Sequence, residues 1–496
     1  MTPTTPTSLR KSPLARNWRF AAAAILTVVA IPSLYAQGRV GPQSVAPIAE
    51  KLIDAVVNIS TSQTMKGTQG VPLPNVPKGS PFEEFFEDFF NRKGGRQQAE
   101  RKVSSLGSGF VIDAIEGLVV TNNHVIDGAD EIIINFSDGS KLKVDKVLGK
   151  DTKTDLALLK VTPKKPLKAV SFGSSSELKV GDWVMAIGNP FGLGGSVTVG
   201  IISAKQRDIN SGPYDDYLQT DAAINKGNSG GPLFNMEGQV IGVNTAIISP
   251  TGGSIGIGFA VPSDTAVSVV DQLKQFGETR RGWLGVRIQS VTEDIAESVG
   301  IRENVGALVA GVTPDGPAAK AGIAPGDVVT KFDGKEVSSM RGLPRIVSQT
   351  PIGKQVDVEL LRKGQKLTLQ AMIGRLQEDA DNDDASKPKE QSGAPTTGQV
   401  LIGMRLTPLT DDLRKTYGLD QKVKGVVVTA VEPQSQAAQK GIKVGDVIVE
   451  ASQDAVASAE DVAKSIEKVR KAGRKAVLLR VESAKGDMRF VAVPIE

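Results

Sequence analysis

A duplicated segment limits most strongly what this chain of 496 residues can fold into. Residues 312–329 recur as residues 431–448, at a spacing typical of whole domains. The matched positions include Pro314 and Pro433, Ala318 and Ala437, Gly322 and Gly441, and Gly326-Asp327 and Gly445-Asp446. Two copies at this spacing predict two related domains and not a solenoid. At about 150 residues per domain, the preceding part of the chain holds one further domain.

The region before the repeat is rich in β-forming residues. From Gly107 to about Val261, short β-rich stretches alternate with Gly, Asn and Asp, which predicts a barrel or a sandwich. The 53 glycines and the aromatic content of 4% also favour turn-rich β structure over helical bundles. Helices are predicted at its flanks, over 45–56 and over 263–276, the second with Ser263 as its N-cap and Gly277 just past its end.

The N-terminus has the layout of a secretory signal peptide. A basic stretch leads into the apolar run 20–31, and Pro32 and the small residue Ala36 follow. The apolar run is too short for a comfortable membrane span, and no later segment is long and apolar enough for one. We therefore expect residues 1–36 to direct export. Leu34 departs from the small residue of a consensus cleavage site, so an uncleaved anchor with peripheral membrane association is the alternative.

Charge and residue usage exclude several functional classes. The formal net charge is +4, but four cations and no acid lie within residues 1–36, so the rest of the chain is neutral. We therefore expect no nucleic-acid partner. The chain has no cysteine and one histidine, which excludes disulfides and His/Cys zinc sites within one chain. We expect no metal and no cofactor.

Residues 82–90 place five Phe at helical spacing, with acidic residues on the opposite arc. One interpretation is a short helix that packs on its own domain. The other is a mobile excursion, flanked by Gly and Pro, that buries its Phe face against another subunit or a client protein. The acidic face argues against binding to an anionic membrane.

Three short motifs in the β-rich region contain the residues of a hydrolytic triad, in the order His, Asp, Ser. They are Thr121-Asn-Asn-His124-Val125, Thr154-Asp155-Leu-Ala-Leu158 and Gly227-Asn-Ser229-Gly-Gly-Pro232. Acyl transfer from an amide needs a hydroxyl nucleophile, a base of near-neutral pKa and a carboxylate that orients the base. His124 is the sole histidine, so a histidine-dependent mechanism has no other base.

The glycine-rich loop around the serine predicts an oxyanion hole. Gly227, Asn228 and Ser229 form a turn whose backbone N–H groups can converge beside the nucleophile, with Gly227 and Ser229 as the expected donors. Each motif alone also fits an ordinary structural role, such as a satisfied histidine, a turn acid or a glycine-rich turn. Their joint occurrence favours catalysis, and no triad position is missing as it would be in a degenerate protease.

With these motifs and Gln219-Thr-Asp-Ala-Ala-Ile-Asn225, the sequence resembles the HtrA/Do-type (Deg) serine proteases of the bacterial periplasm. The resemblance covers nearly all of the exported chain. It implies a mainly β fold: a chymotrypsin-like double β-barrel protease domain, with two six-stranded barrels and the triad in the cleft between them, followed by two α+β PDZ domains. The expected bounds are 37–278 for the protease domain with its Phe-rich loop at about 66–104, 279–376 and 399–496 for the PDZ domains, and 377–398 for a linker.

The resemblance also implies where substrate binds. The strand that pairs with the substrate backbone would comprise Thr245, Ala246, Ile247, Ile248 and Ser249, and the primary specificity pocket would be lined by Ile224, Ile247 and Ile257. Branched apolar walls leave room for small apolar side chains, so we expect cleavage after Val, Ala or Ile. The Phe-rich segment corresponds to a family loop that can block a neighbouring subunit. Several relatives carry a cysteine pair in that loop, and this chain has none.

PDZ domains bind chain ends by adding the peptide as a strand, and a glycine-containing loop holds the terminal carboxylate. In the two copies that position is occupied by Trp283-Leu284-Gly285-Val286 and by Leu401-Ile402-Gly403-Met404. The second loop departs more from the usual pattern. The alternative for the second copy is therefore that it binds chain ends more weakly or serves in assembly.

The sequence thus predicts an exported, ATP-independent serine endopeptidase for unfolded or damaged proteins. By resemblance, it forms a homotrimer or a multiple of trimers and also acts as a chaperone. The alternative from another class is a proteolytically idle holdase or PDZ scaffold. An esterase is a third candidate, which the peptide-capturing repeats disfavour.

Overall fold

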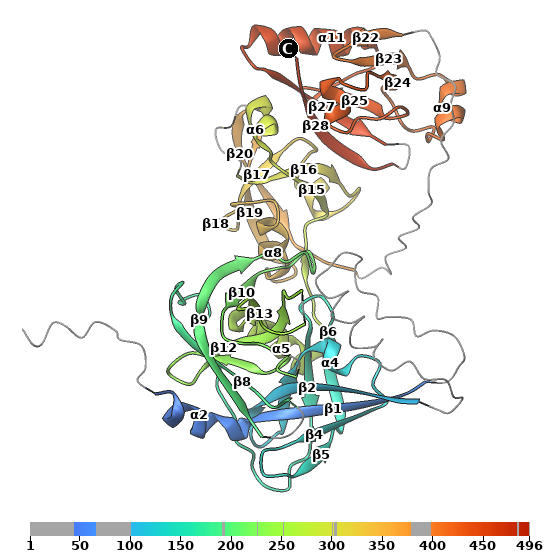
Figure 1. Cartoon of the computed structure of the whole chain (residues 1–496). Coiled ribbons are helices and arrows are strands. Elements are labelled where there is room, and N and C mark those ends of the chain that lie inside the picture. The colour runs from blue at the N-terminus through green and yellow to red at the C-terminus, as the bar shows by residue number, and fades with distance from the viewer. Residues whose placement is uncertain are drawn as a thin grey trace, which may run out of the picture.

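The structure is a computed structural model that describes residues 44–65, 101–190, 194–225, 227–250, 252–299, 301, 305–377, 398–483 and 486–495. The fold is mainly β, and Figure 1 shows the N-terminal domain with the two repeat domains stacked beyond it. The predicted signal peptide, the Phe-rich segment and nearly all of the predicted linker lie outside the described residues. Within the described ranges, no helix is both long and apolar enough to span a membrane.

The first half of the N-terminal domain is an antiparallel sheet in the order β5-β4-β1-β2-β3-β7-β6. Its strands are β1 (Val56–Met65), β2 (Arg101–Asp113), β3 (Leu118–Thr121), β4 (Glu131–Asn135), β5 (Lys141–Lys143), β6 (Lys146–Asp151) and β7 (Leu156–Lys160). The sheet of described residues has 7 strands instead of the expected six. The additional strand arises because the short β5 folds back onto the outer edge of β4.

The second half is a closed barrel in the order β10-β13-β12-β11-β8-β9, as the resemblance implied. Its strands are β8 (Trp183–Gly188), β9 (Ser196–Arg207), β10 (Tyr217–Thr220), β11 (Pro232–Phe234), β12 (Val240–Ile247) and β13 (Gly258–Pro262). The β12–β13 register shifts between Asn244 and Ala246, which leaves Thr245 as a bulge.

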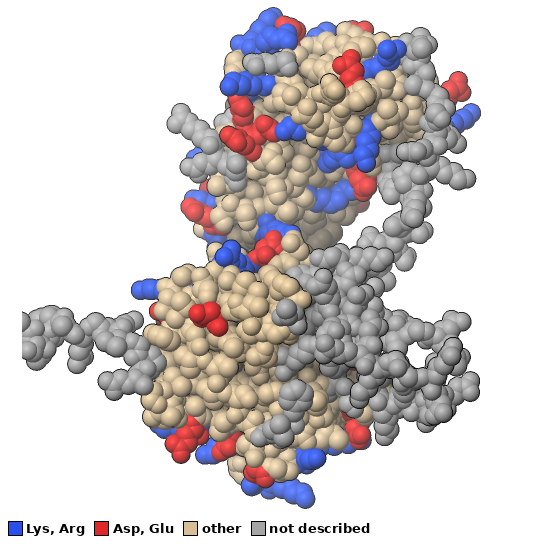
Figure 2. Space-filling model, in the orientation of Figure 1, with Lys and Arg blue, Asp and Glu red and all other residues tan. Residues whose placement is uncertain are grey.

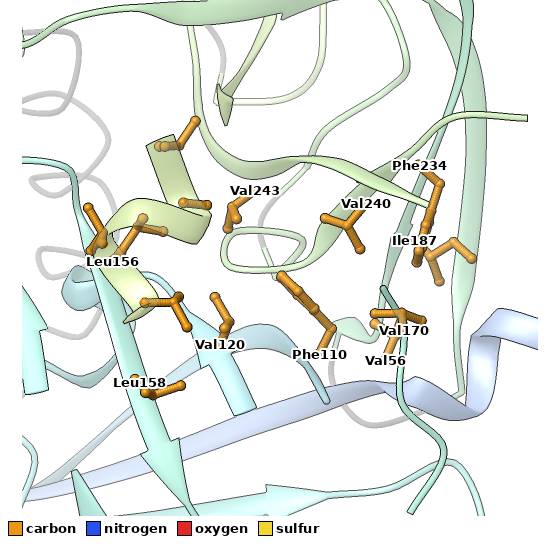
Figure 3. Packing of buried hydrophobic residues seen from close by; sticks show 14 of the residues in the cluster. Val56, Phe110, Val120, Leu156, Leu158, Val170, Ile187, Phe234, Val240 and Val243 are labelled. Atoms are coloured by element: carbon orange, nitrogen blue, oxygen red, sulfur yellow. The ribbon is translucent and has the colours of Figure 1, made fainter. Parts of the chain in front are cut away.

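One hydrophobic core joins the two halves. Its members include Phe110, Val120 and Leu156 from the first half and Ile187, Phe234 and Val243 from the second. Figure 3 shows these side chains pointing into a common interior. Burial of each large apolar side chain stabilises the fold by roughly 1.5–3 kcal/mol. The shared core therefore fixes how the two halves face each other at their boundary.

Helices flank this domain close to the predicted positions. α2 (Ala46–Leu52) continues into the 3-10 turn η2 (Ile53–Ala55), and α5 (Ser263–Phe276) follows the last barrel strand. Gly277 ends α5 in the left-handed region, as predicted, with φ of 74°. The prediction of Ser263 as N-cap is wrong. Pro262 holds that position, because the Ser263 hydroxyl donates instead to the Gly173 carbonyl at 2.7 Å.

The first repeat forms an α+β domain with the sheet order β15-β16-β17-β19-β20. Its elements are β14 (Gly282–Trp283), β15 (Val286–Ser290), α6 (Glu293–Val299), β16 (Ala307–Val312), α7 (Pro317–Lys320), β17 (Val328–Phe332), β18 (Lys335–Glu336), α8 (Gly342–Ser348), β19 (Gln355–Arg362), β20 (Gln365–Met372) and β21 (Gly374–Arg375). β18 pairs with β17, and β14 pairs with β21 in a separate small sheet.

The second repeat forms a similar domain with the sheet order β22-β23-β24-β25-β27-β28. Its elements are β22 (Gln399–Leu401), β23 (Met404–Pro408), α9 (Asp411–Tyr417), β24 (Val426–Val431), α10 (Gln436–Gln439), β25 (Val447–Ala451), β26 (Asp454–Ala455), α11 (Ala459–Lys471), β27 (Ala476–Glu482) and β28 (Met488–Pro494). The duplicated aspartates serve the same turn, since Asp327 accepts the N–H of Ala324 and Asp446 accepts that of Lys443.

The repeat domains contact each other and the N-terminal domain. Ile295 of α6 shares a hydrophobic cluster with Phe490 of β28, and the side-chain amide of Gln289 exchanges two hydrogen bonds with the Phe490 backbone at 2.8 and 2.9 Å. On the other side, Arg341 and Arg345, at α8, form ion pairs with the loop that precedes β10. Figure 2 shows basic and acidic side chains interspersed where the domains meet.

Candidate active site

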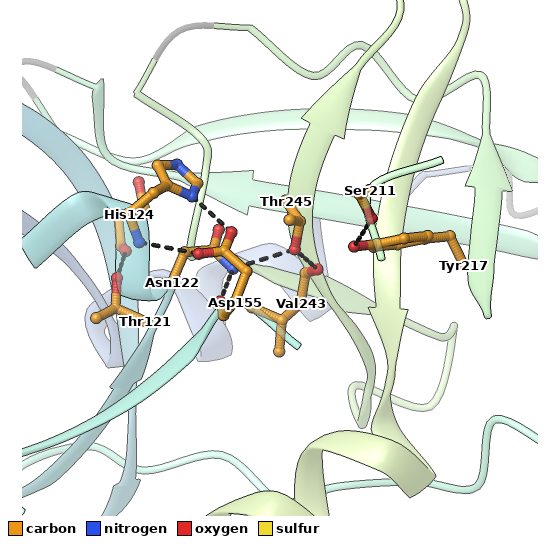
Figure 4. A network of polar contacts seen from close by, with 9 residues as sticks. Thr121, Asn122, His124, Asp155, Ser211, Tyr217, Val243 and Thr245 are labelled. Carbon is orange, nitrogen blue, oxygen red and sulfur yellow. Dashed lines mark hydrogen bonds and ion pairs between the residues drawn. The ribbon is translucent and has the colours of Figure 1, made fainter. Parts of the chain in front are cut away.

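His124 lies in the short helix α4 (Asn123–Ile126), directly after β3. Its backbone N–H donates to Asp155 Oδ1 at 2.9 Å, and its Nδ1 lies 2.6 Å from Asp155 Oδ2. Figure 4 shows the imidazole turned toward this carboxylate. The contact fixes the ring so that Nε2 is the atom left for proton transfer.

Asp155 occupies an unusual backbone conformation. It lies in the turn between β6 and β7 with φ of 56°, in the left-handed region that non-glycine residues rarely adopt. Its carbonyl oxygen accepts the N–H of Asn123 at 3.1 Å and the side-chain amide of Asn122 at 2.7 Å. These bonds hold the strained turn against the residues that precede His124.

The environment of His124 favours its protonated form. Burial acts to lower the pKa of His124, but the charge of Asp155, its hydrogen bond and the charge of Asp127 together raise that pKa above the ordinary value of 6.5. The side chains of His124 and Asp155 are 19% and 18% exposed, so the pair is shielded but reachable. An imidazolium that forms during catalysis is therefore stabilised in place.

Ser229 lies in the loop before β11, in the second half of the domain. Gly227 and Gly230 take positive φ values of 95° and 84°. At Gly230 a Cβ would lie 2.3 Å from the Ser108 carbonyl oxygen and 2.4 Å from Thr121 Oγ1, so only glycine lets the loop approach the strand that leads to His124. The glycines thus let the loop that carries Ser229 pack against the first half of the domain, which carries His124.

The loop leaves two backbone donors available. Within the described part of the chain, the N–H groups of Gly227 and Ser229 donate to no protein acceptor. The N–H of Asn228 is used inside the loop, where it donates to the Asn225 carbonyl at 3.0 Å. Asn228 is therefore part of the loop without being one of its two expected donors, and Gly227 and Ser229 remain suited to an oxyanion.

This chain is similar to known proteins in each of its domains. The sequence profile of the trypsin-like peptidase domain matches residues 107–243, and that of the PDZ domain matches residues 282–373 and 400–483. A DegP-like periplasmic serine endoprotease of Brucella suis is 44% identical over 473 residues, which cover 91% of this chain and 89% of the relative. The chain belongs to the DegP-like, HtrA-type family of serine endoproteases.

Further relatives support this assignment. A DegP-like periplasmic serine endoprotease of Rhizobium meliloti is 44% identical over 437 residues, covering 86% of this chain and 84% of the relative. Among solved structures, the HtrA-type protease AlgW with a decapeptide is 40% identical, covers 68% of this chain and 100% of that chain, and has a TM-score of 0.54. The same protease with a tripeptide has a TM-score of 0.55, 40% identity, and coverage of 68% and 98%.

In this HtrA-type protease, described strands pair with only part of one edge of the expected substrate strand. Asn244 exchanges hydrogen bonds with Gly230 and Gly231, but no described strand pairs with that edge of β12 beyond Asn244. Thr245 and Ala246 are buried, Ile247 is half-buried and Ile248 is exposed. Ser249 follows in the loop. A substrate backbone could therefore add to β12 beside the serine loop.

Only part of the expected pocket forms one cluster. Ile224 is buried and packs with Ile247. Ile257 packs with a different cluster, and its carbonyl accepts the N–H of Ile248 at 3.1 Å. At Gly258 a Cβ would lie 2.8 Å from Ile224 Cγ1, so this glycine makes room for the buried isoleucine.

Two polar residues to which the sequence assigned no role, Asn122 and Ser108, tie the halves of this protease together. Asn122 donates to Thr245 Oγ1 at 3.1 Å, and Thr245 donates to the Val243 carbonyl at 3.0 Å, as Figure 4 shows. Ser108 Oγ donates to the Gly227 carbonyl at 2.5 Å, and the Ser108 N–H donates to the Ser229 carbonyl at 2.8 Å. Their only sequence signal is that Asn122 lies within the histidine motif.

A third residue to which the sequence assigned no role is Arg281, which lies two residues before Trp283. Its guanidinium is buried and pairs with Asp151, the last residue of β6. Asp151 also accepts the hydroxyl of Thr154 at 2.5 Å, and Thr154 immediately precedes Asp155. Arg281 therefore braces the turn that carries Asp155. No local sequence motif predicts this pair, because its two residues lie far apart in the chain.

The two glycine-containing PDZ loops differ. In the first, Trp283 ends β14, Leu284 is buried in the domain core, Gly285 has φ of 79° and Val286 begins β15. In the second, Leu401 ends β22 and Met404 begins β23, so that Ile402 and Gly403 alone form the turn. The second loop is thus a tight hairpin.

Proposed function

We propose that Ser229 is the nucleophile, His124 the general base and then acid, and Asp155 the residue that orients His124. Ser229 Oγ attacks the peptide carbonyl carbon and passes its proton to Nε2 of His124. His124 then protonates the leaving amine, and water hydrolyses the acyl-enzyme by the same route. The N–H groups of Gly227 and Ser229 bind the oxyanion. The observation that carries this proposal is the 2.6 Å contact between His124 and Asp155.

The experiment compares the wild type with Ser229→Ala on a reduced, unfolded protein. We expect the wild type to release peptides, which mass spectrometry identifies, and the variant to release none. If neither protein cleaves the substrate between about pH 6 and pH 9, the chain is an idle holdase or PDZ scaffold.

The same peptides report the preferred residue before the cleaved bond. We infer a preference for Val, Ala or Ile. The buried Ile224 and the half-buried Ile247 make the pocket shallow, and they offer no partner to a charged substrate side chain. Ile224→Ala should admit Leu, Met or Phe. An unchanged preference in this variant would place the pocket elsewhere.

We propose that this protease is exported to the periplasm, where it acts on unfolded proteins and captures exposed chain ends with a PDZ domain. The domain bounds remain those expected from the sequence, 37–278, 279–376 and 399–496. The periplasmic names of its relatives support export. Fractionation of cells and sequencing of the mature N-terminus test it. Suppression of aggregation by Ser229→Ala, measured by light scattering, tests chaperone activity.

We also propose a homo-oligomer, a trimer or a multiple of trimers. Trp183 and Val199 are exposed on adjacent strands β8 and β9, with 43% and 38% of their surface accessible. Figure 2 shows few charged side chains over this part of the domain. An exposed aromatic and apolar surface of this kind is typical of an interface. Trp183→Lys should reduce the mass measured by analytical ultracentrifugation, and an unchanged mass would locate the interface elsewhere.

A further inference from the structure

The strands that follow the two glycine-containing loops are equivalent. β15 begins after the loop of the first PDZ domain and β23 after that of the second. In each domain the carbonyl of the loop glycine, Gly285 or Gly403, accepts a backbone N–H from the residue after the neighbouring strand, Thr313 or Glu432, at 2.9 Å. A peptide whose terminal carboxylate is held by either loop would therefore add to the outer edge of β15 or β23.

These two edges differ in occupancy. Among the described residues, β15 is the last strand of its sheet, whereas β23 lies between β24 and β22. β22 pairs Gln399 with Leu406, Val400 with Arg405 and Leu401 with Met404, all antiparallel. Figure 1 shows β22 beside β23 in the second PDZ domain. The chain itself thus fills the edge that a captured tail would need.

β22 also has the direction and the anchor of a tail. A terminal carboxylate held by the loop forces a bound peptide to end at the loop, and β22 ends there with Leu401. The Leu401 side chain packs against the hydrophobic cluster that contains Leu406 of β23 and Val462 and Ile466 of α11. α11 corresponds by chain order to α8 of the first domain. Leu401 therefore lies where the last side chain of a tail would be buried.

The second loop is also unsuited to hold a carboxylate. Ile402 and Gly403 have φ of 43° and 75°, as a two-residue type I′ hairpin turn requires. The Met404 backbone is committed to its ladder pair with Leu401. In the first PDZ domain only Gly285 of the four loop residues has positive φ. The Met404 N–H of the second loop is thus used by the hairpin and is not available to a carboxylate.

We propose that residues 399–402 are a built-in occupant of the second PDZ groove, and that free chain ends bind only the first PDZ domain. This inference rests on the proposed capture of chain ends by a PDZ domain. A segment joined directly to its site acts at an effective concentration on the order of millimolar or above. A free tail must displace it, which lowers the apparent affinity of the second groove by at least about tenfold.

Hydrogen exchange with mass spectrometry tests the proposal on the full chain, with Ser229→Ala to prevent digestion. The probe is a ten-residue peptide that ends in a free valine carboxylate, and its amidated form is the control. We expect the free-acid peptide to protect β15 and α8 and to leave β23 and α11 unchanged. Protection of β23 and α11 at the same peptide concentration overturns the proposal. Absence of protection at both grooves refutes PDZ tail capture instead.

A second experiment opens the groove. The opened variant combines Gln399→Pro, which removes a ladder donor, with Leu401→Asp, which removes the apolar anchor. If this double variant loses exchange protection in β24, the milder Leu401→Ala replaces it as the second opened variant. Val400→Thr is the matched control, because Val400 is exposed on the same strand. We expect the opened variants, and not the control, to gain peptide-dependent protection of β23 and α11, with at least tenfold tighter binding there. No gain in either opened variant contradicts the proposal.

Discussion

Two of the connections between the first PDZ domain and the protease domain differ in burial. In one, the buried pair Arg281 and Asp151 has side chains only 8% and 2% exposed. In the other, Arg341 pairs with Asp208 and Arg345 with Asp216, and these side chains are 23% to 38% exposed. The same kinds of charged groups meet in both, but solvent screens only the second.

The difference shows which connection holds the catalytic geometry. Removal of one member of a buried ion pair leaves a charge without partner or water, whereas an exposed pair exchanges its contact for hydration. The buried pair braces the turn of Asp155 through Thr154. The exposed pairs reach only the loop that precedes β10. We therefore expect the two connections to respond very differently to mutation.

The largest effect is expected at the end of the buried connection. Asp155→Asn keeps the shape of the side chain but cannot hold His124 in the productive tautomer, so kcat should fall about 10⁴-fold. Peptide release from an unfolded substrate measures this. A loss below about tenfold would show that Asp155 does not orient His124.

Breakage of the buried pair should mainly affect stability. Arg281→Met leaves Asp151 buried without its cation, which should cost about 3 to 5 kcal/mol and lower the melting midpoint of the protease domain by roughly 10 °C. The double variant Arg281→Met with Asp151→Leu removes both charges and should recover much of this loss. If the single variant melts within about 2 °C of the wild type, the pair does not brace the domain.

Breakage of the exposed pairs should change little. Arg341→Ala and Arg345→Ala should each cost about 0 to 1 kcal/mol, because solvent screens these partly exposed pairs, and the effect should shrink further in high salt. Thermal melting at low and high ionic strength measures both. A loss as large as that of Arg281→Met would remove the contrast between the two connections.

The smallest effect concerns pH. His124 must be neutral to accept a proton, and its raised pKa places the acid limb of kcat/KM above the ordinary 6.5. Asp127 is one of the charges that raise this pKa, so Asp127→Asn should move the limb to lower pH while the plateau stays constant. A shift to higher pH would contradict this electrostatic assignment.

Much of the fold was predictable because its signals are local or repeated. Alternating short apolar stretches indicated the β structure, and Gly277 marked the end of α5. The duplicated Gly-Asp motif indicated two related domains. Its signal is local, because Asp327 and Asp446 each accept a backbone hydrogen bond within the turn of their own domain. Ser263 failed as an N-cap because its hydroxyl has a distant partner, the Gly173 carbonyl, which no local rule includes.

The sequence by itself determined which groups are available for catalysis, namely a sole histidine, an aspartate and a serine in ordered motifs, and that two PDZ copies follow them. Those properties depend on residue type and short spacing. The tertiary structure alone decided that Arg281 braces the Asp155 turn and that β22 fills the second PDZ groove. Both features depend on which strand edges and charged groups become buried when segments distant in the sequence come together. That burial is a property of the folded chain and not of any short stretch of sequence.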